Sequence, residues 1–411
     1  MLKKIKEIAK EYPNTFWVMM LGMFIDQLGG NLIYPFFALY VTARFKVGLT
    51  EVGMLLGAMT AGGIIGGLIG GWLTDKIGRK NIILFGLLIS GLFSIVIIFI
   101  NRFELLFAVG LLVGLLGSMS GPAYQAMLVD IIPESNRNSA FGMVRVVFNL
   151  TVAIGPLIGG FISDYSYNWL FIGDAVTSAI TFLIVLKFLQ ETKPEEASET
   201  VSEDAPTGKR GYLDILKDKD YIFLLGCLML IFAVMMQMLS TLSVYMRDVH
   251  AFPNKYYGYI LSLNAIMVVV MQFWVSRRSE KLPPLIAMII GAVFSTFGYA
   301  LFGFVEGIWM FAVAMAILTI GEMIIDPMSQ TLAAKFSPPD MRGRYMAALH
   351  FSLSLSNLFT PYLAGLVIDN YEPKWIWYTC GIVGIIAIFG FLILHYRLKS
   401  RGIQAKAVAE V

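Results

Sequence analysis

Long apolar runs separated by short polar segments extend along almost the whole chain. Each run is about 20 residues long or longer, which is the length an α-helix needs to cross the hydrocarbon core of a bilayer. We predict twelve membrane-spanning helices, at 15–43, 50–74, 82–100, 104–131, 139–163, 169–189, 221–246, 257–275, 285–305, 309–334, 345–368 and 375–395. Strands of a membrane barrel would alternate apolar and polar residues, which these runs do not do. The pattern indicates an all-α polytopic membrane protein.

The composition excludes several classes of function. Of the 411 residues, 57% are hydrophobic and 14% are charged, whereas about 25% charged is usual in soluble domains. The cysteines, Cys227 and Cys380, both lie inside apolar runs and give no disulfide framework. The histidines are scattered, and the motifs of zinc peptidases, serine hydrolases and nucleotide-binding loops are absent from the sequence. We expect no enzymatic activity, no metal, no cofactor, no nucleic-acid partner and no use of ATP.

Basic residues gather in alternate loops and near both ends of the chain. Such an excess of Lys and Arg marks the cytoplasmic loops of membrane proteins. We therefore predict a cell-membrane protein with both termini in the cytoplasm, where a basic amphipathic segment at 1–14 precedes the first span and a tail at 397–411 follows the last.

A polar stretch at 191–220 divides the predicted spans six and six. It is rich in Glu, Ser, Thr and Pro, so we predict a flexible cytoplasmic linker between bundles at 15–190 and 221–396. The segments 130–142 and 335–346 both read as Pro, an acid, Arg and then small and apolar residues, at matching places in the two halves. This similarity indicates an internal duplication.

A short charged segment at 71–80, here named the clasp, lies between two runs that carry no charge. Its sequence, GWLTDKIGRK, resembles the signature between the second and third helices of the major facilitator superfamily, G-x-L-x-D-x-x-G-R-K. The resemblance implies two six-helix bundles that rock around a central substrate site. Glycines at 62, 63, 66, 67, 70 and 71 favour close helix packing before the clasp. The counterpart of the clasp in the second half, VSRRSEK at 275–281, keeps the basic charges and loses the glycines and the aspartate.

The resemblance further implies that charges at one end of the first bundle form a conformational switch that holds the outward-open state. The alternative is that these charges only cap helices and cover the surface. Arg145 lies about two turns into the fifth span, so we expect a carboxylate partner for it. The expected switch residues are Gly71, Asp75, Gly78, Arg79, Lys80, Asp130 and Arg145.

The fifth span contains a second pattern, G-x-x-x-G-P-x-x-G-G with Thr151 at the first glycine position. It resembles the antiporter signature of the same superfamily, which implies an exporter. The alternative is a helix kink that says nothing of direction. The pattern residues are Gly155, Pro156, Gly159 and Gly160.

Asp26, Glu322 and Asp326 are the acidic residues inside predicted spans that we expect to couple transport to protons, because a charge there costs about 2.5–3.5 kcal/mol or more and needs a reason. Asp26, with Gln27 and Asn31 nearby, resembles the first-span aspartate of many drug:proton antiporters; a structural carboxylate is the alternative. Glu322 and Asp326 lie on one helix face about 6 Å apart. Two carboxylates that close resist ionising together, so one can hold a proton at neutral pH. The alternative is a single carboxylate neutralised by Arg145 or a helix end.

The fourth span departs from the family pattern R-x-x-Q-G. When its glycine is aligned with Gly114, Gly110 and Val113 occupy the Arg and Gln positions. This departure shifts the expected proton coupling to Asp26, Glu322 and Asp326.

Other polar, aromatic and thioether side chains of the spans can line an adaptable cavity for lipophilic cations, although each is more often a packing residue. The candidates for substrate binding are Gln27, Asn31, Tyr34, Phe37, Met235, Gln237, Met238, Asn264, Gln272 and Gln330.

We therefore expect a monomeric secondary active transporter, surrounded by membrane lipids, that exports amphipathic or cationic lipophilic small molecules by alternating access in exchange for protons. The proton gradient is the expected energy source. An importer or flippase of sugars, lipid-linked sugars or other metabolites is the alternative within transport. A membrane receptor or scaffold is the alternative outside it.

Overall fold

The computed structural model describes residues 12–133, 136–193, 215–338 and 341–400. These ranges are helical and contain no strand. Twelve helical segments are long and apolar enough to cross a membrane, and each overlaps one of the predicted spans. They are Asn14–Phe45, Leu49–Ile77, Arg79–Phe99, Phe103–Ile131, Ala140–Tyr165, Asn168–Phe188, Lys219–Ser240, Asn254–Ser279, Pro284–Leu301, Ile308–Phe336, Arg342–Asn370 and Trp375–Ser400. The predicted fold class is confirmed.

The chain forms two compact units. The N-unit comprises Met1–Ser198 with Ser243–Ala265, and the C-unit comprises Glu199–Leu242 with Ile266–Val411. Segment 243–265 therefore groups with the first bundle, although the sequence places it in the second. The predicted linker at 191–220, the N-terminal segment and the tail lie largely outside the described residues, so their bounds stay predictions.

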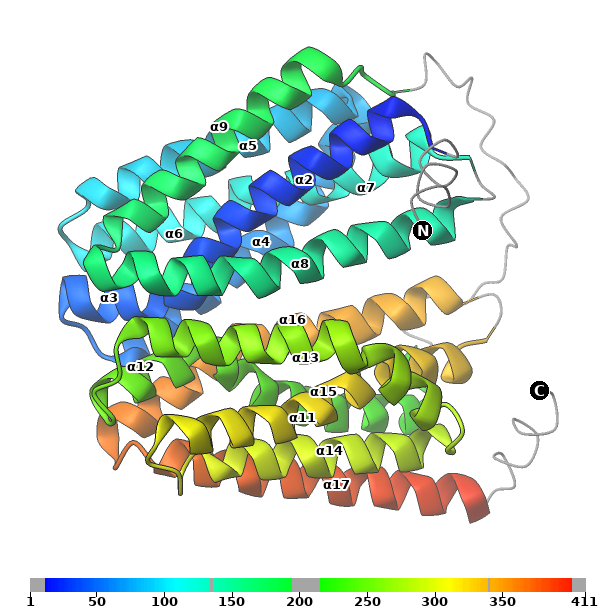
Figure 1. The fold of residues 1–411 in the computed structure, drawn as a ribbon. Helices are drawn as coiled ribbons and strands as arrows, with labels where there is room; N and C mark the ends of the chain where they lie inside the picture. The colour runs from blue at the N-terminus through cyan, green and yellow to red at the C-terminus, as the bar shows by residue number, and fades with distance from the viewer. Residues whose placement is uncertain (1–11, 134–135, 194–214, 339–340, 401–411) are drawn as a thin grey trace. The chain divides into compact units, whose positions relative to one another are not determined.

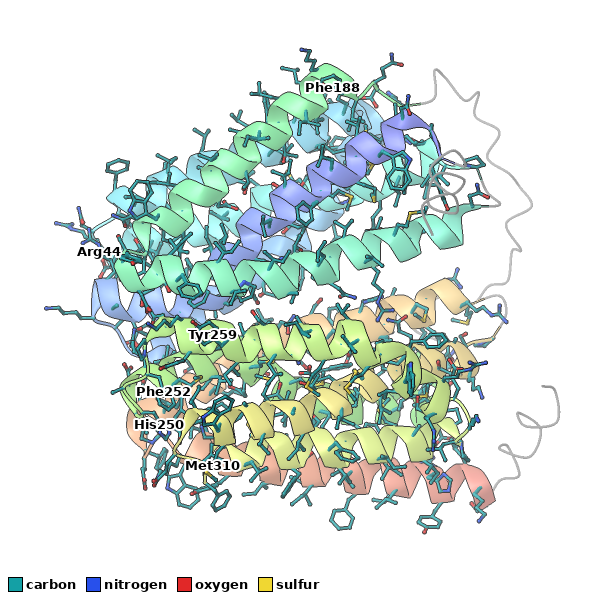
Figure 2. All side chains as sticks on the ribbon, viewed as in Figure 1. Arg44, Phe188, His250, Phe252, Tyr259 and Met310 are labelled. Carbon is teal, nitrogen blue, oxygen red and sulfur yellow. The ribbon has the colours of Figure 1, made fainter. Side chains whose placement is uncertain are left out.

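The helices of both units are drawn in Figure 1. The N-unit contains α2 (Asn14–Ile33), η1 (Tyr34–Phe36), α3 (Phe37–Phe45), α4 (Leu49–Ile77), α5 (Arg79–Phe99), α6 (Phe103–Gly117), α7 (Ser120–Ile131), α8 (Arg137–Tyr165) and α9 (Asn168–Phe188), with most of α12 (Leu242–Asp248) and the first half of α13 (Asn254–Ser279). The C-unit contains α11 (Lys219–Ser240), the rest of α13, α14 (Pro284–Leu301), α15 (Ile308–Phe336), α16 (Arg342–Asn370) and α17 (Trp375–Ser400). Arg44 on α3 and Phe188 on α9 lie at opposite ends of the N-unit (Figure 2).

Two predicted spans of the N-unit are broken where the sequence weakens helical hydrogen bonding. Pro35 lies in the 3-10 turn η1 between α2 and α3, because proline has no N–H to donate and disfavours helix in the residue before it. The fourth span is interrupted between α6 and α7, where the backbone N–H of Met119 donates to the oxygen of Leu116. Such a hydrogen bond, between residues three apart, is of the 3-10 type and tightens the helix locally.

The two units repeat the same pairwise packing. In the N-unit, α2 packs on α8 and α9, and α5 packs on α9. In the C-unit, the helices at the corresponding places pack in the same way, α11 on α16 and α17, and α14 on α17. Each unit has its own apolar core, with Phe16, Ile83 and Met127 in one and Leu228, Met288 and Phe391 in the other. The packing agrees with the duplication that the sequence indicates.

The glycines of α4 let it approach α6 closely. A Cβ atom built on Gly66 would collide with the backbone oxygen of Leu115, and one built on Gly114 of α6 would collide with the backbone of Met59. Gly62 faces α6 in the same way, and Gly70 faces the backbone of Met119 between α6 and α7. By contrast, a Cβ on Gly67 would meet nothing within 4 Å. The predicted packing role of this glycine series is thus confirmed for its α6-facing members.

We predict that Gly66→Ala destabilises the N-unit and that Gly67→Ala does not. The added methyl group at residue 66 must push backbone against backbone, and such overpacking costs about 1–3 kcal/mol. Thermal unfolding of the purified protein in detergent, followed by circular dichroism, measures the difference. Equal midpoints for the two variants would contradict the packing described for α4 and α6.

Candidate functional site

The turn inside the clasp depends on Gly78. This residue separates α4 from α5 and has φ 109° and ψ 160°, a backbone conformation that only glycine adopts readily. It is the one glycine with positive φ among the described residues. The glycine in the G-R-K part of the pattern is therefore required by backbone geometry.

Arg79 connects the clasp to the end of the fourth span. Its Nε donates to Asp130 Oδ2 at 3.1 Å, and its Nη2 lies 3.9 Å from Asp75 Oδ1. The Arg79 side chain is 12% exposed and that of Asp75 is 80% exposed. Because solvent screens an exposed pair, Asp130 is the stronger partner of the two. The structure thus brings three of the expected switch residues together.

The other expected switch residues have different surroundings. Lys80 donates from Nζ to the backbone oxygen of Leu186 at 2.9 Å. A Cβ on Gly71 would meet nothing within 4 Å. Arg145 is exposed, and the carboxylate partner expected for it is not found among the described residues. Its depth along the span predicted that partner, but the side chain is not buried.

Glu191, which the sequence analysis missed, completes the clasp. Its carboxylate accepts hydrogen bonds from the backbone N–H groups of Arg79 at 2.8 Å and Lys80 at 3.1 Å. A carboxylate at a helix N-terminus satisfies unpaired N–H groups and the positive end of the helix dipole. A Cβ on Gly78 would collide with this carboxylate. Beside it, Lys193 Nζ donates to the backbone oxygen of Lys76 at 2.9 Å. The first residues of the predicted linker are therefore fastened to the clasp.

Partial burial alone would raise the pKa of Glu191, but hydrogen bonds from the backbone N–H groups of Lys193, Arg79, Thr192 and Lys80 outweigh it. The pKa of Glu191 is therefore lowered. The ionised carboxylate is the form that holds the clasp.

Asp26 has a second carboxylate beside it that the sequence analysis also missed. Asp174 of α9 is 5% exposed and accepts a short hydrogen bond from Ser94 Oγ of α5. Asp26 accepts a hydrogen bond from Ser178 Oγ at 3.4 Å, one helical turn after Asp174, and the two carboxylates are close enough to repel each other. Neither forms an ion pair with any described basic residue. An acid inside an apolar run was the signal that could have identified Asp174.

Two further features shape this acidic pair. Gly29 lies one turn after Asp26, and a Cβ there would stand 2.8 Å from Asp174 Oδ1, so glycine is needed for α2 to approach α9. Tyr124 of α7 has a buried hydroxyl with no hydrogen-bond partner in the described part of the chain, and Asp26 acts electrostatically on it. The site presents carboxylate and hydroxyl oxygens from four helices. Such a site can hold a proton or another small cation.

Glu322 and Asp326 do not share one environment, contrary to the expectation. Glu322 is 8% exposed and accepts a hydrogen bond from the Tyr299 hydroxyl at 3.2 Å, whereas Asp326 is exposed. Their spacing places them on one side of α15. It does not determine which of them α14 covers, and α14 covers only the first.

The antiporter pattern of α8 packs against α2 and α13 within the N-unit. A Cβ on Gly155 would stand 2.6 Å from Asn31 Cβ, and one on Gly159 would stand 2.7 Å from the backbone oxygen of Leu32. Gly160 faces Gly258 of α13, and the backbone of Gly258 in turn lies against Pro156. Thr151, which replaces the first glycine of the pattern, accepts a hydrogen bond from Asn31 Nδ2 at 3.2 Å.

Several predicted substrate-binding residues are engaged in internal contacts. Gln237 is buried and hydrogen-bonds with Thr241 at 2.6 Å, Gln272 donates to the backbone oxygen of Met323 at 2.9 Å, and Phe37 and Asn264 are buried. Tyr34 and Gln330 are exposed, whereas Gln27, Met235 and Met238 are partly buried. Ligand binding by this set stays a prediction.

The chain is similar to one known protein family and to known transporters. The family model described as Major Facilitator Superfamily matches residues 19–349 and 255–409. The Na(+), Li(+), K(+)/H(+) antiporter of Planococcus maritimus is 27% identical over 95% of this chain and 98% of its own. Multidrug resistance protein MdtH of Escherichia coli (strain SE11) is 22% identical over 91% of this chain and 92% of its own. The crystal structure of nucleoside transporter NupG shares the fold, with a TM-score of 0.79 at 13% identity over 93% of this chain and 99% of that one.

We predict that Glu191→Gln lowers the thermal stability at a pH where the wild-type Glu191 is ionised. Where the wild-type Glu191 is protonated, the substitution should have no effect. Because folding lowers the pKa of Glu191 from its ordinary value of 4.5, its stabilisation is fully present above that value and is lost as the pH falls through the lowered folded-state pKa. At pH 7 the variant should unfold at lower temperature, by an amount that corresponds to about 0.5–1 kcal/mol for a solvent-exposed helix cap.

Thermal unfolding of both proteins in detergent from pH 7 to pH 3 tests this dependence. The gap between the two midpoints should close at the acid end. The matched control Glu306→Gln changes an exposed loop carboxylate and should leave the midpoint unchanged. A gap that stays constant down to pH 3 would show that the Glu191 charge is not what holds the clasp.

Proposed function

We propose that this chain, which belongs to the Major Facilitator Superfamily and is therefore a multi-pass membrane transporter and not an enzyme, exports amphipathic or cationic lipophilic compounds in exchange for protons. Export occurs by alternating access in the cell membrane, with both termini in the cytoplasm and a monomer as the working unit. The proton gradient supplies the energy, and no cofactor takes part.

The observation that carries the proposal is the Asp26–Asp174 pair. Two carboxylates inside membrane-spanning helices, without an ion pair to a described basic residue, cost free energy of folding, so their presence indicates a function. Repulsion between them makes double ionisation unfavourable, so the pair holds a proton readily and releases it when a cation approaches. That exchange is the step a proton-coupled exporter requires.

Other features support the direction and the switch. The antiporter pattern of α8 resembles that of exporters, and its glycines bring α8 against α2, the helix that carries Asp26. The Arg79–Asp130 pair and the Glu191 cap hold one arrangement of the clasp, and breaking them would release another. The presence of a multidrug resistance protein among the relatives supports the proposal of lipophilic substrates. Glu322 and Asp326 stay candidates for a second coupling position.

A second candidate function is the exchange of alkali cations for protons. It is favoured by a relative that is described as a Na(+), Li(+), K(+)/H(+) antiporter. The hydroxyl oxygens of Ser94, Ser178 and Tyr124 around the acidic pair suit hard cations, which prefer oxygen ligands. The two functions are compatible with one acidic pair.

We predict that Asp26→Asn and Asp174→Asn each abolish proton-driven uptake of a cationic dye into everted membrane vesicles. Neither amide can exchange a proton, so the coupling step is lost, while binding of the dye persists. The matched control Asp164→Asn changes an exposed carboxylate at the end of α8 and should transport at the wild-type rate.

The same vesicles separate the alternatives. Quenching of a pH-sensitive dye on addition of Na⁺, Li⁺ or K⁺ reports cation/proton exchange, and uptake of labelled sugars reports an importer or flippase. Wild-type vesicles that accumulate no cationic dye under an imposed pH gradient would refute the exporter proposal. Undiminished transport by both Asn variants would remove the acidic pair from it.

A further inference from the structure

Three basic side chains of the C-unit have no acidic partner, unlike their counterparts in the clasp. Arg277 and Arg278 lie in the last turn of α13 and Lys281 follows it, at the place where the N-unit has the clasp. They form no ion pair with any described carboxylate. All three are exposed. In the clasp, by contrast, Arg79 is neutralised by Asp130. Glu280 lies next to them in sequence and is exposed, without an ion pair to any of the three. The second copy of the pattern therefore leaves a cluster with a net positive charge.

The loss of the glycines leaves an open groove beside that cluster. α4 approaches α6 through its glycines, whereas α13 contains only Gly258, which lies in the N-unit. Accordingly, α13 has no close packing on α14 or α15 comparable to that of α4 on α6. Two hollows occupy the space, of about 350 Å³ and about 510 Å³. They share Trp274, Arg278 and Lys281 as lining residues and are therefore continuous.

The groove changes from basic to apolar along its length. The basic cluster lines the smaller hollow, and the larger one extends from Arg278 and Lys281 to Ala287 and Ile290 of α14 and Ile324 of α15. Trp274 lines both hollows with 76% of its surface exposed, and tryptophan is enriched at membrane interfaces. Arg277 lies over the ring of Phe273, 5.8 Å from its centre. The groove has the polarity profile of a phospholipid.

We propose that this groove, lined by α13, α14 and α15 of the C-unit, binds an anionic phospholipid. The phosphate lies among Arg277, Arg278 and Lys281, and an acyl chain follows the apolar strip past Trp274. Charge selects the headgroup, because a polybasic site at a membrane surface attracts anionic lipids by about 1 kcal/mol for each basic residue. The apolar lining selects a lipid over a free phosphate ion. The inference goes beyond the proposed transport function and does not depend on it.

The test measures lipid binding to the purified full-length protein in a neutral detergent. Phosphatidylglycerol or phosphatidylcholine is added, and bound lipid is counted by native mass spectrometry while thermal unfolding is followed in parallel. We expect phosphatidylglycerol to bind and to raise the unfolding midpoint. The triple variant Arg277→Gln, Arg278→Gln, Lys281→Gln should bind it roughly 100-fold more weakly.

A matched triple variant controls for net charge. Lys46→Gln, Arg102→Gln and Lys374→Gln remove the same charge at other loops, and binding should stay as in the wild type. Inorganic phosphate and dihexanoyl phosphatidylglycerol should produce no comparable shift, since neither fills the apolar strip. Equal binding of phosphatidylcholine, an equal shift with inorganic phosphate, or unchanged binding by the first triple variant would each overturn the proposal.

Discussion

The free-energy cost of a carboxylate inside a membrane-spanning helix is the main physical constraint on this structure. Asp26 and Asp174 lie near each other in a setting that supplies hydroxyl groups and, among the residues the structure describes, no basic partner. Hydroxyl groups hydrogen-bond a carboxylate but do not neutralise it, which is why we propose that the pair responds to a proton or a cation. Gly29 keeps α2 near enough to α9 for the two acids to interact. The close contact between α2 and α9 thus holds the two acids near each other.

The two units use one packing plan for different purposes. In the N-unit, glycines let α4 pack closely on α6, and the clasp pairs Arg79 at the start of α5 with Asp130 at the end of α7. Glu191 then ties the chain that follows α9 to the turn at Gly78. In the C-unit, the corresponding segment keeps its three basic residues and loses the aspartate and the glycines, and α13 packs less closely on α14 and α15 than α4 does on α6. Loss of the motif in one copy thus accompanies a different surface.

Much of the fold could be predicted from the sequence, because a span of apolar residues has few alternatives in a membrane. The clasp was identifiable because its residues are adjacent in the chain. The roles of Asp174 and Glu191 were less accessible, because their partners, Ser94, Asp26 and the N–H groups of α5, lie far away in sequence; the sequence shows an acid inside an apolar run at Asp174 but not what it contacts. For the same reason, the spacing of Glu322 and Asp326 gave their shared helix face but not the cover that α14 places over one of them.

Proton release by the purified protein is the most direct test of whether one acidic site in the N-unit exchanges a proton for cargo. A cationic dye is added to the protein in weakly buffered detergent solution, and the pH change is recorded with an indicator. We expect proton release by the wild type and none by the double variant Asp26→Asn, Asp174→Asn. Dye binding without proton release in the wild type, or equal release by the double variant, would contradict it.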